Sequence, residues 1–207
     1  MTFSRSEIDF ATRLSINNTV LEQKHVAKLL GVWIEDNMSW SRNCKELSVK
    51  AYSRLSMLTK LKYVGVGMED LIDVYKLFIR SCLEYCSVAF HSSLTVDQTE
   101  KLERIQKTCL KVILGDMYIT YNIALEMCQL ETLSSRRQKR CLNFSLKSLK
   151  YPHTAKLFPL RPTNELNVRD PEVFSVNFAK TFTYKNSTIP FCQRLLNEHC
   201  KSKKKKR

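Results

Sequence analysis

Glycine and proline are scarce along this chain, and their scarcity restricts its fold more than any other feature of the sequence. Only four glycines and five prolines occur among the 207 residues. A fold built from many short strands needs frequent tight turns, which these two residues supply most readily. Because few such turns are available, we predict long helices and an α+β fold that is predominantly α-helical.

Three helices are predicted between residues 39 and 115. In the first, apolar residues recur at steps of three and four, which is the spacing of one helical face. These residues are Leu47, Ala51, Leu55, Leu58 and Leu61. The second helix, over residues 71–85, is apolar nearly all round, as is typical of a central helix in a bundle. The third begins with a predicted capping box between Thr95 and Gln98 and ends near Gly115. Residues 39–115 are therefore expected to form a three-helix bundle.

The segment before this bundle, residues 1–38, is predicted to contain β structure. Residues 13–16 alternate polar and apolar side chains, and Asn17 and Asn18 tolerate the backbone conformation of a tight turn. Residues 26–34 are nearly all apolar and indicate a largely buried strand. Gly31 within that run indicates a bulge or the close approach of another backbone. We expect an N-terminal β-hairpin here.

The chain beyond the bundle divides into three predicted segments. Residues 116–160 are expected to form a helical connection of two shorter helices, at roughly 121–129 and 132–150. Residues 161–200 are expected to be loop-rich, because Pro159, Pro162 and Pro171 interrupt the pattern; a short last helix is placed near residues 189–200. Residues 201–207 are expected to be a disordered basic tail.

Charge points to the class of partner. The formal net charge is +14, and six of these positive charges lie in residues 201–207, so that the rest of the chain carries +8. A basic body favours a polyphosphate partner, because each neutralised phosphate releases counterions. A solubilising surface is the alternative. The tail itself is either a nuclear import signal or a nonspecific polybasic end.

The chain is predicted to be intracellular. Its eight cysteines are scattered, and residues 1–5 are polar and lack the apolar core of a secretory signal. Reduced thiols are the simplest interpretation of such cysteines. No apolar run approaches the ~20 residues that a membrane span needs, so no membrane partner is expected.

Candidate catalytic and metal-binding groups are weak throughout. Polymerases and metal nucleases hold two divalent ions with clustered carboxylates, and the sequence contains no Asp-Asp pair. Turn formation accounts for Glu35 and Asp36, and helix capping for the acidic residues at 69–73. Cys82, Cys86 and His91 are the nearest approach to a zinc site, but no second pair matches them, so packing explains them better. We predict no catalytic residue, no metal site and no cofactor in this chain.

A basic helical surface is the strongest remaining candidate for a site. The first predicted helix carries Arg42, Lys45, Lys50 and Arg54 away from its apolar face. A solvated helix face is the alternative interpretation. The nucleic-acid interpretation gains from the preceding strand, where a glycine lies between Lys28 and Trp33. Backbone amides and flanking cations can hold a phosphate chain without reading its sequence.

Five sequence blocks, taken in order, extend this interpretation. They are MTFSRS at 1–6; KLLGVWI at 28–34 followed by MSW at 38–40; Tyr75 followed by IRSCLEY at 79–85; LERIQK at 102–107 ending in ILG at 113–115; and Leu125, Leu130, Leu133 and Arg136–Arg137. Their order and spacing resemble those of the reverse transcriptases of non-LTR (LINE-type, jockey-like) retrotransposons, over about residues 1–160. The chain departs from that family at Leu29 or Leu30, where Tyr is preferred, and at Ser81, where Pro is preferred.

The resemblance implies a function for each segment. Residues 1–38 would be the end of the palm with a primer-grip-like β-hairpin, residues 39–115 a thumb-like bundle, and residues 116–160 the connection. Lys28, Leu29, Leu30 and Gly31 would lie on the primer grip. The family's fingers, catalytic aspartates and Mg²⁺ belong to a part upstream of these blocks.

The expected function is therefore that of a fragment or remnant of an RNA-directed DNA polymerase. It would hold an RNA/DNA primer–template duplex without sequence specificity, in company with an upstream reverse transcriptase core, and would be inactive alone. The alternative is a non-catalytic helical module that binds nucleic acid or another protein.

Overall fold

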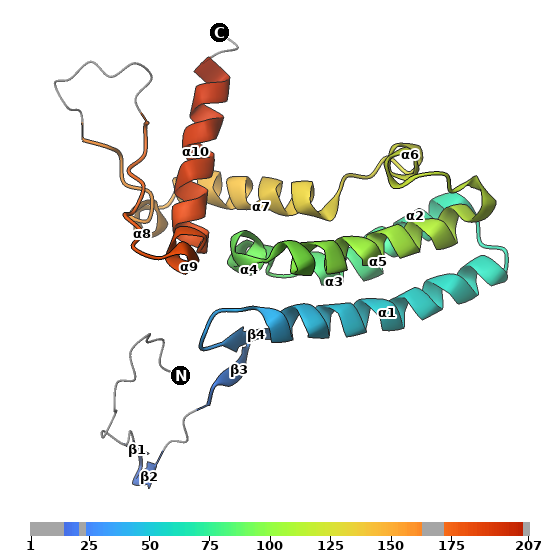
Figure 1. Cartoon of the computed structure of the whole chain (residues 1–207), viewed down its shortest axis with the longest axis horizontal. Helices are drawn as coiled ribbons and strands as arrows, with labels where there is room; N and C mark the ends of the chain where they lie inside the picture. The colour runs from blue at the N-terminus through green and yellow to red at the C-terminus, as the bar shows by residue number, and fades with distance from the viewer. Residues whose placement is uncertain (1–14, 21–23, 163–171, 205–207) are drawn as a thin grey trace.

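The computed structural model describes residues 15–20, 24–162 and 172–204 (Figure 1). Two small β-hairpins lie at its N-terminal end and are followed by helices. The fold is α+β and predominantly α-helical, as the sequence predicts. The expectations for residues 1–14 and 163–171 lie outside the described residues.

Both hairpins are short and antiparallel. Strands β1 (Ser15–Ile16) and β2 (Thr19–Val20) flank a turn at Asn17 and Asn18, both with positive φ, as predicted. Strands β3 (Val26–Leu29) and β4 (Val32–Glu35) form the second pair. The prediction of one largely buried strand over residues 26–34 is wrong. The run reverses direction at Leu30 and Gly31, and most of β3 is exposed.

The first long helix, α1 (Ser41–Tyr63), begins directly after the second hairpin. Its buried face includes Leu47, Ala51 and Leu58, which belong to the predicted apolar set. Glu35, the last residue of β4, accepts a hydrogen bond from the backbone N–H of Arg42 at 3.1 Å. A carboxylate at this end satisfies one of the free N–H groups of the helix and suits its dipole. The end of the hairpin therefore caps α1.

The second predicted helix comprises three consecutive segments: α2 (Met68–Val74), the π-helical η1 (Tyr75–Arg80) and α3 (Ser81–Glu84). The backbone stays right-handed helical across both junctions, so they form one continuous helix. Its buried residues follow at four-residue steps: Leu71, Tyr75, Ile79 and Leu83. Four residues overshoot a turn of α-helix by about 40°. The π-helical turn has more residues per turn, so it reduces the rotation of successive buried side chains around the helix axis. The four side chains therefore stay in one core.

The third helix of the bundle is α5 (Val96–Leu114), which follows the short α4 (Ser87–Phe90) and η2 (His91–Ser93). The predicted capping box between Thr95 and Gln98 is present. Gln98 Nε2 donates to the carbonyl of Ser39 at one end of α1, and Lys62 Nζ donates to the carbonyl of Ile113 at the other. Helices α1 and α5 therefore run side by side in the same direction (Figure 1).

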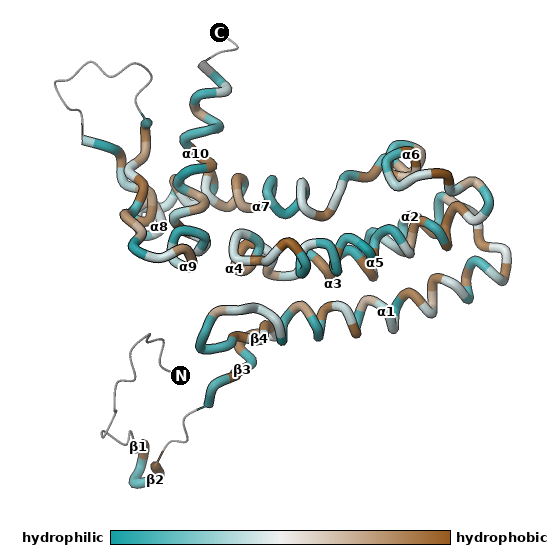
Figure 2. Tube along the Cα trace, viewed as in Figure 1, coloured by the Kyte–Doolittle hydropathy of each residue, from teal (hydrophilic) through white to brown (hydrophobic). Residues whose placement is uncertain are grey.

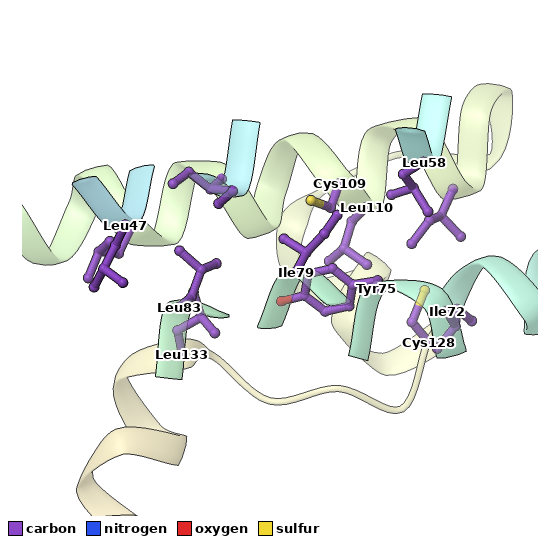
Figure 3. Packing of buried hydrophobic residues seen from close by; sticks show 14 of the residues in the cluster. Leu47, Leu58, Ile72, Tyr75, Ile79, Leu83, Cys109, Leu110, Cys128 and Leu133 are labelled. Carbon is purple, nitrogen blue, oxygen red and sulfur yellow. The ribbon is translucent and has the colours of Figure 1, made fainter. Parts of the chain in front are cut away.

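The main core lies between α1, the α2–α3 helix and α5 (Figure 3). Apolar residues alternate with polar ones along each of these helices, as the hydropathy colouring shows (Figure 2). The core also contains Ala124 and Leu125 of α6 (Tyr121–Met127) and Leu133 at the start of α7 (Leu133–Ser148). The short η3 (Gly115–Met117) joins α5 to α6. The bundle predicted for residues 39–115 thus shares its core with the segment that follows.

A second core lies where α10 (Thr188–Lys204) crosses α7 (Figure 1). It includes Cys141, Phe158, Phe174, Cys192 and Leu196. The short helices α8 (Pro152–Ala155) and α9 (Phe182–Lys185) lie in the loops around it. Asn197 of α10 accepts from the N–H of Phe174 and donates to its carbonyl, at 2.9 and 3.0 Å. This pair of bonds ties the loop that contains Phe174 to the last helix.

The last helix also corrects the prediction of a disordered tail over residues 201–207. Helix α10 continues to Lys204, so the first four of these residues are helical. Lysine has a high helix propensity, and a helix already anchored by a buried face can extend through such residues. Residues 205–207 lie outside the described part of the chain.

Candidate nucleic-acid interface

The four predicted primer-grip residues lie at the tip of the β3–β4 hairpin. Lys28 pairs with Trp33 and Leu29 with Val32, and Leu30 and Gly31 form the two-residue turn. Both turn residues have positive φ, 47° and 85°, which is the geometry of a tight hairpin turn. The side chain of Leu30 is 83% exposed. The tip therefore presents apolar side chains and a glycine backbone to solvent.

The tip rests on the end of α3 through one aromatic side chain. Tyr85 Oη donates to the carbonyl of Leu30 at 2.8 Å. A Cβ placed on Gly31 would lie 3.6 Å from Cε1 of the Tyr85 ring. The sequence predicts a bulge or the close approach of another backbone at Gly31; the structure instead places Gly31 in the hairpin turn, with the Tyr85 side chain in ordinary contact distance. Tyr85 thus sets the position of the hairpin relative to the bundle.

Trp33 brings the hairpin and α1 together. The guanidinium carbon of Arg42 lies 4.9 Å from the centroid of the indole ring, and Lys28 Nζ lies 5.6 Å from it. Both distances are within the range of cation–π attraction. The backbone N–H of Trp33 also donates to Oδ1 of Asn43 at 3.3 Å. Lys28 and Arg42, which the sequence places in two separate predicted sets, therefore flank one aromatic ring.

The other three predicted basic residues on α1 differ in their surroundings. Lys45 and Lys50 are exposed and form no ion pair with any residue that the structure describes. Arg54 is half-buried, and its Nη1 donates to the backbone carbonyl of Phe78 in η1. Arg42 itself forms an ion pair with Glu46 at 3.3 Å. Arg54 is thus bound within the fold, whereas Lys45 and Lys50 remain available to a ligand.

The sequence does not predict a cluster of arginines around Glu84. This carboxylate is buried at the end of α3 and accepts bonds from Arg136 and Arg140 of α7. Burial, reinforced by repulsion from Arg136, lowers the pKa of the nearby Arg80 guanidinium, whereas the hydrogen bond to Glu84 raises the pKa of Arg136. The motif blocks at 79–85 and 136–137 were the available signal. The spacing of these two blocks in the sequence does not indicate that their side chains are in contact.

Arg137, next to this cluster, is completely buried. None of its three guanidinium nitrogens has a hydrogen-bond partner among the described residues. Burial lowers the pKa of Arg137, and the neighbouring Glu103 opposes that shift. The interior beside α7 therefore holds a guanidinium group to which none of the described residues offers a hydrogen-bond acceptor.

The acidic residues and cysteines that were considered for metal binding contribute to helix capping, hydrogen bonding or packing instead. Glu35 caps α1, and the exposed Asp36 accepts a hydrogen bond from His25, which lowers the pKa of the carboxyl. Within residues 15–20, 24–162 and 172–204, no group of three or more His, Cys, Asp or Glu side chains is arranged to hold a metal ion. The eight cysteines are free thiols. None of the described helices has the length and apolar character needed to cross a membrane.

A pocket of about 290 Å³ lies away from the hairpin, between residues 68–76 and 127–129. None of the predicted site residues lines it. The candidate interface is thus an open surface formed by the hairpin tip, Tyr85, Trp33 and the N-terminal half of α1.

Comparisons with known proteins leave this surface to be interpreted by its chemistry alone. No protein-family model, no curated protein sequence and no solved structure matches the chain.

Proposed function

We propose that this chain grips an RNA/DNA primer–template duplex through its phosphate backbone, as the primer-grip and thumb-like part of a reverse transcriptase of the non-LTR type. The observation that carries the proposal is the joint contact of Lys28 and Arg42 with Trp33. It makes the hairpin and the basic helix one surface. A continuous cationic surface beside an exposed backbone turn suits a phosphate chain and reads no base sequence.

The two exposed lysines of α1 extend this surface along the helix. Lys45 and Lys50 lie five residues apart, a separation of about 7.5 Å along a helix axis. Around the helix they lie about 140° apart, with Arg42 between them, so they widen the cationic surface on both sides of Arg42. The Leu29 and Leu30 side chains at the hairpin tip add apolar contact area for the sugars of the bound strand.

The central experiment measures binding of a labelled RNA–DNA hybrid duplex by fluorescence anisotropy at several salt concentrations. We expect the logarithm of the affinity to fall linearly with the logarithm of the salt concentration. The double variant Lys28→Gln/Arg42→Gln should bind more weakly and reduce that slope by roughly 0.9 for each phosphate that the variant no longer neutralises. A duplex of different sequence should bind equally well.

The matched control is Lys156→Gln/Lys180→Gln, which removes the same charge from two exposed lysines of the C-terminal region. It should change the slope much less. Equal effects of the two double variants would mean that binding follows net charge alone, and a wild-type chain that binds no duplex at low salt would overturn the proposal.

The catalytic chemistry would come from another part of a polymerase that supplies paired aspartates and Mg²⁺. We therefore expect that the purified chain, given Mg²⁺, a primed template and nucleotides, does not extend the primer. Extension that survives removal of contaminating polymerases would contradict this division of labour.

A protein-interaction role is the second candidate, because Val49 and Tyr52 are exposed on α1 beside the same lysines. Charge reversal at Arg42, Lys45 and Lys50 separates the two roles. Loss of duplex binding favours the nucleic-acid role. Retained duplex binding together with loss of a protein partner favours the second.

We also propose that the basic end of the chain directs it to the nucleus. Lys201 and Lys203 continue α10, whose buried face at Cys192 and Leu196 attaches the helix to the second core. A fluorescent fusion with and without residues 201–207 tests this, and identical distributions would reject it.

A further inference from the structure

We propose that Arg80, Arg136 and Arg140, grouped around Glu84 where η1 and α3 meet α7, form a second binding site for a backbone phosphate of the nucleic acid. This inference rests on the proposed function and extends the contact surface beyond the hairpin and α1. The ligand is a phosphodiester group, and the site takes it without regard to base identity.

The cluster contains more positive charge than it can neutralise. The Glu84 side chain is 2% exposed, and Arg136 donates Nε to one carboxylate oxygen at 2.5 Å and Nη2 to the other at 3.2 Å. Arg140 Nη2 adds a third bond at 2.8 Å. Arg80 lies one helical turn before Glu84 and forms no ion pair with a described residue. Glu131, a second carboxylate that acts on Arg136, is already paired with Lys139 at 2.6 Å.

Arg136 makes the two-bond link between α7 and Glu84 of α3. It bonds both oxygens of the buried carboxylate, in the paired geometry that makes arginine–carboxylate contacts strong. Arg80 is on the same helix as Glu84 and takes no part in this bridge, and Arg140 adds a bond to an oxygen that Arg136 already contacts. Their positive charges repel that of Arg136, and this repulsion contributes to the lowered pKa of Arg80. The completely buried Arg137, with no acceptor among the described residues, adds a further positive charge beside the cluster.

The surplus charge is accessible from solvent. The Arg140 side chain is 48% exposed and uses one of its nitrogens on Glu84, which leaves Nε and Nη1 for another acceptor. Arg136 is 28% exposed. Guanidinium groups match the oxygens of a phosphate in a planar, two-bond arrangement. An anion at this place would receive donors from Arg140 and would reduce the repulsion among the arginines.

The cluster adjoins the candidate interface through the chain itself. Glu84 and Tyr85 are consecutive residues: the first holds the arginines, and the second holds the carbonyl of Leu30 at the hairpin tip. A strand bound along the hairpin tip would then reach the arginines by way of the half-exposed Tyr85 side chain. The two sites are neighbouring contacts on one path.

The test compares Arg140→Gln and Arg80→Gln with Lys139→Gln by anisotropy of the labelled RNA–DNA hybrid duplex. Lys139→Gln removes the same charge from the neighbouring position on α7, about 100° around the helix from Arg140, and its amine is paired with Glu131. We expect Arg140→Gln and Arg80→Gln each to weaken binding severalfold and to lower the salt slope by about 0.9. Lys139→Gln should leave the slope unchanged.

Thermal unfolding shows whether each variant is folded. Should Arg140→Gln unfold, Arg80→Gln decides alone, because Arg80 makes no side-chain hydrogen bond with a described residue. Arginine variants that bind like Lys139→Gln would overturn this inference. If Lys28→Gln/Arg42→Gln still weakens binding in that case, the proposed function stands. If the wild-type chain binds no duplex, both fail.

Discussion

At the scale of single residues, Tyr85 has the most consequence for the candidate interface. It is the side chain that joins the tip of the β3–β4 hairpin to the helical bundle, through its bond to the carbonyl of Leu30 and its ring against Gly31. Leu30 has φ 47°, a conformation that costs an ordinary residue roughly 1 kcal/mol or more. The bond from Tyr85 helps to offset that cost.

Tyr85→Phe should loosen the hairpin tip without unfolding the chain. The ring stays, but the hydrogen bond is removed, at a cost of about 0.5–1 kcal/mol for a bond of this kind. We expect faster hydrogen exchange at the amides of Val32 and Trp33, with the thermal unfolding temperature nearly unchanged. Tyr52→Phe, at an exposed tyrosine of α1, is the control. Unaltered exchange in Tyr85→Phe would show that the hairpin turn is stable without the hydrogen bond from Tyr85.

At the scale of elements, η2 joins the two cores through His91. Its ring contacts Phe191 of α10 edge-on, with centroids 5.7 Å apart. Burial, together with the nearby Arg137, lowers the pKa of His91 from 6.5 to about 4. The folded protein therefore keeps this imidazole neutral at pH values where the unfolded chain would bind a proton.

The sign of the resulting pH dependence follows from proton uptake. Between pH 6.5 and about 4 the unfolded state binds more protons at this position, so stability falls as the pH is lowered through this window. From pH 7 to pH 5 the loss should be at most about 2 kcal/mol. His91→Gln should remove this part of the dependence in urea unfolding, and the exposed His153→Gln should not. If His91→Gln loses the same stability between pH 7 and pH 5 as the wild type, the pH dependence comes from other groups.

The helices of the bundle were predictable from the sequence because their signals are local. Leucine spacing predicts α1, and the capping box at Thr95 predicts the start of α5. The second hairpin was not predictable as such, because residues 26–34 are nearly all apolar and give one strand-like run. Its turn uses Leu30, a residue that gives no turn signal.

The candidate site was predictable only in part. Lys28 and Arg42 follow from charge and from resemblance, but their meeting at Trp33 depends on where the hairpin folds back. The Glu84 cluster joins residues 52 and 56 positions apart, a contact that no local pattern contains. The end of α10 was missed because a run of lysines was interpreted as solvated chain, although a packed helix leads into it.

At the scale of the whole molecule, the chain has two cores with α7 between them. Leu110 of α5 lies in the first and Leu196 of α10 in the second, and both are almost completely buried. The described contacts between the two regions are made mainly by α7, α4 and η2 with α10. Such an arrangement allows one part to open while the other stays folded.

Leu196→Ala and Leu110→Ala should therefore have separate effects. Each removes a buried side chain at a cost of about 3 kcal/mol. We expect Leu196→Ala to speed hydrogen exchange in α10 and in the C-terminal half of α7 while sparing α5, with duplex binding retained. Leu110→Ala should speed exchange in the bundle and weaken binding. Equal acceleration everywhere in both variants would show a single cooperative unit.

The attachment of the β3–β4 hairpin determines how it can respond to force. Strand β4 is bonded to α1 twice, from the backbone N–H of Arg42 to Glu35 and from the backbone N–H of Trp33 to Asn43, whereas the turn is bonded only by Tyr85 at the end of α3. A nucleic-acid strand that moves along the turn would pull on a hairpin that is held firmly at β4 and weakly at the turn. The hydrogen bond from Tyr85 to Leu30 would break first. The turn could then follow the moving strand while β4 kept its position on α1.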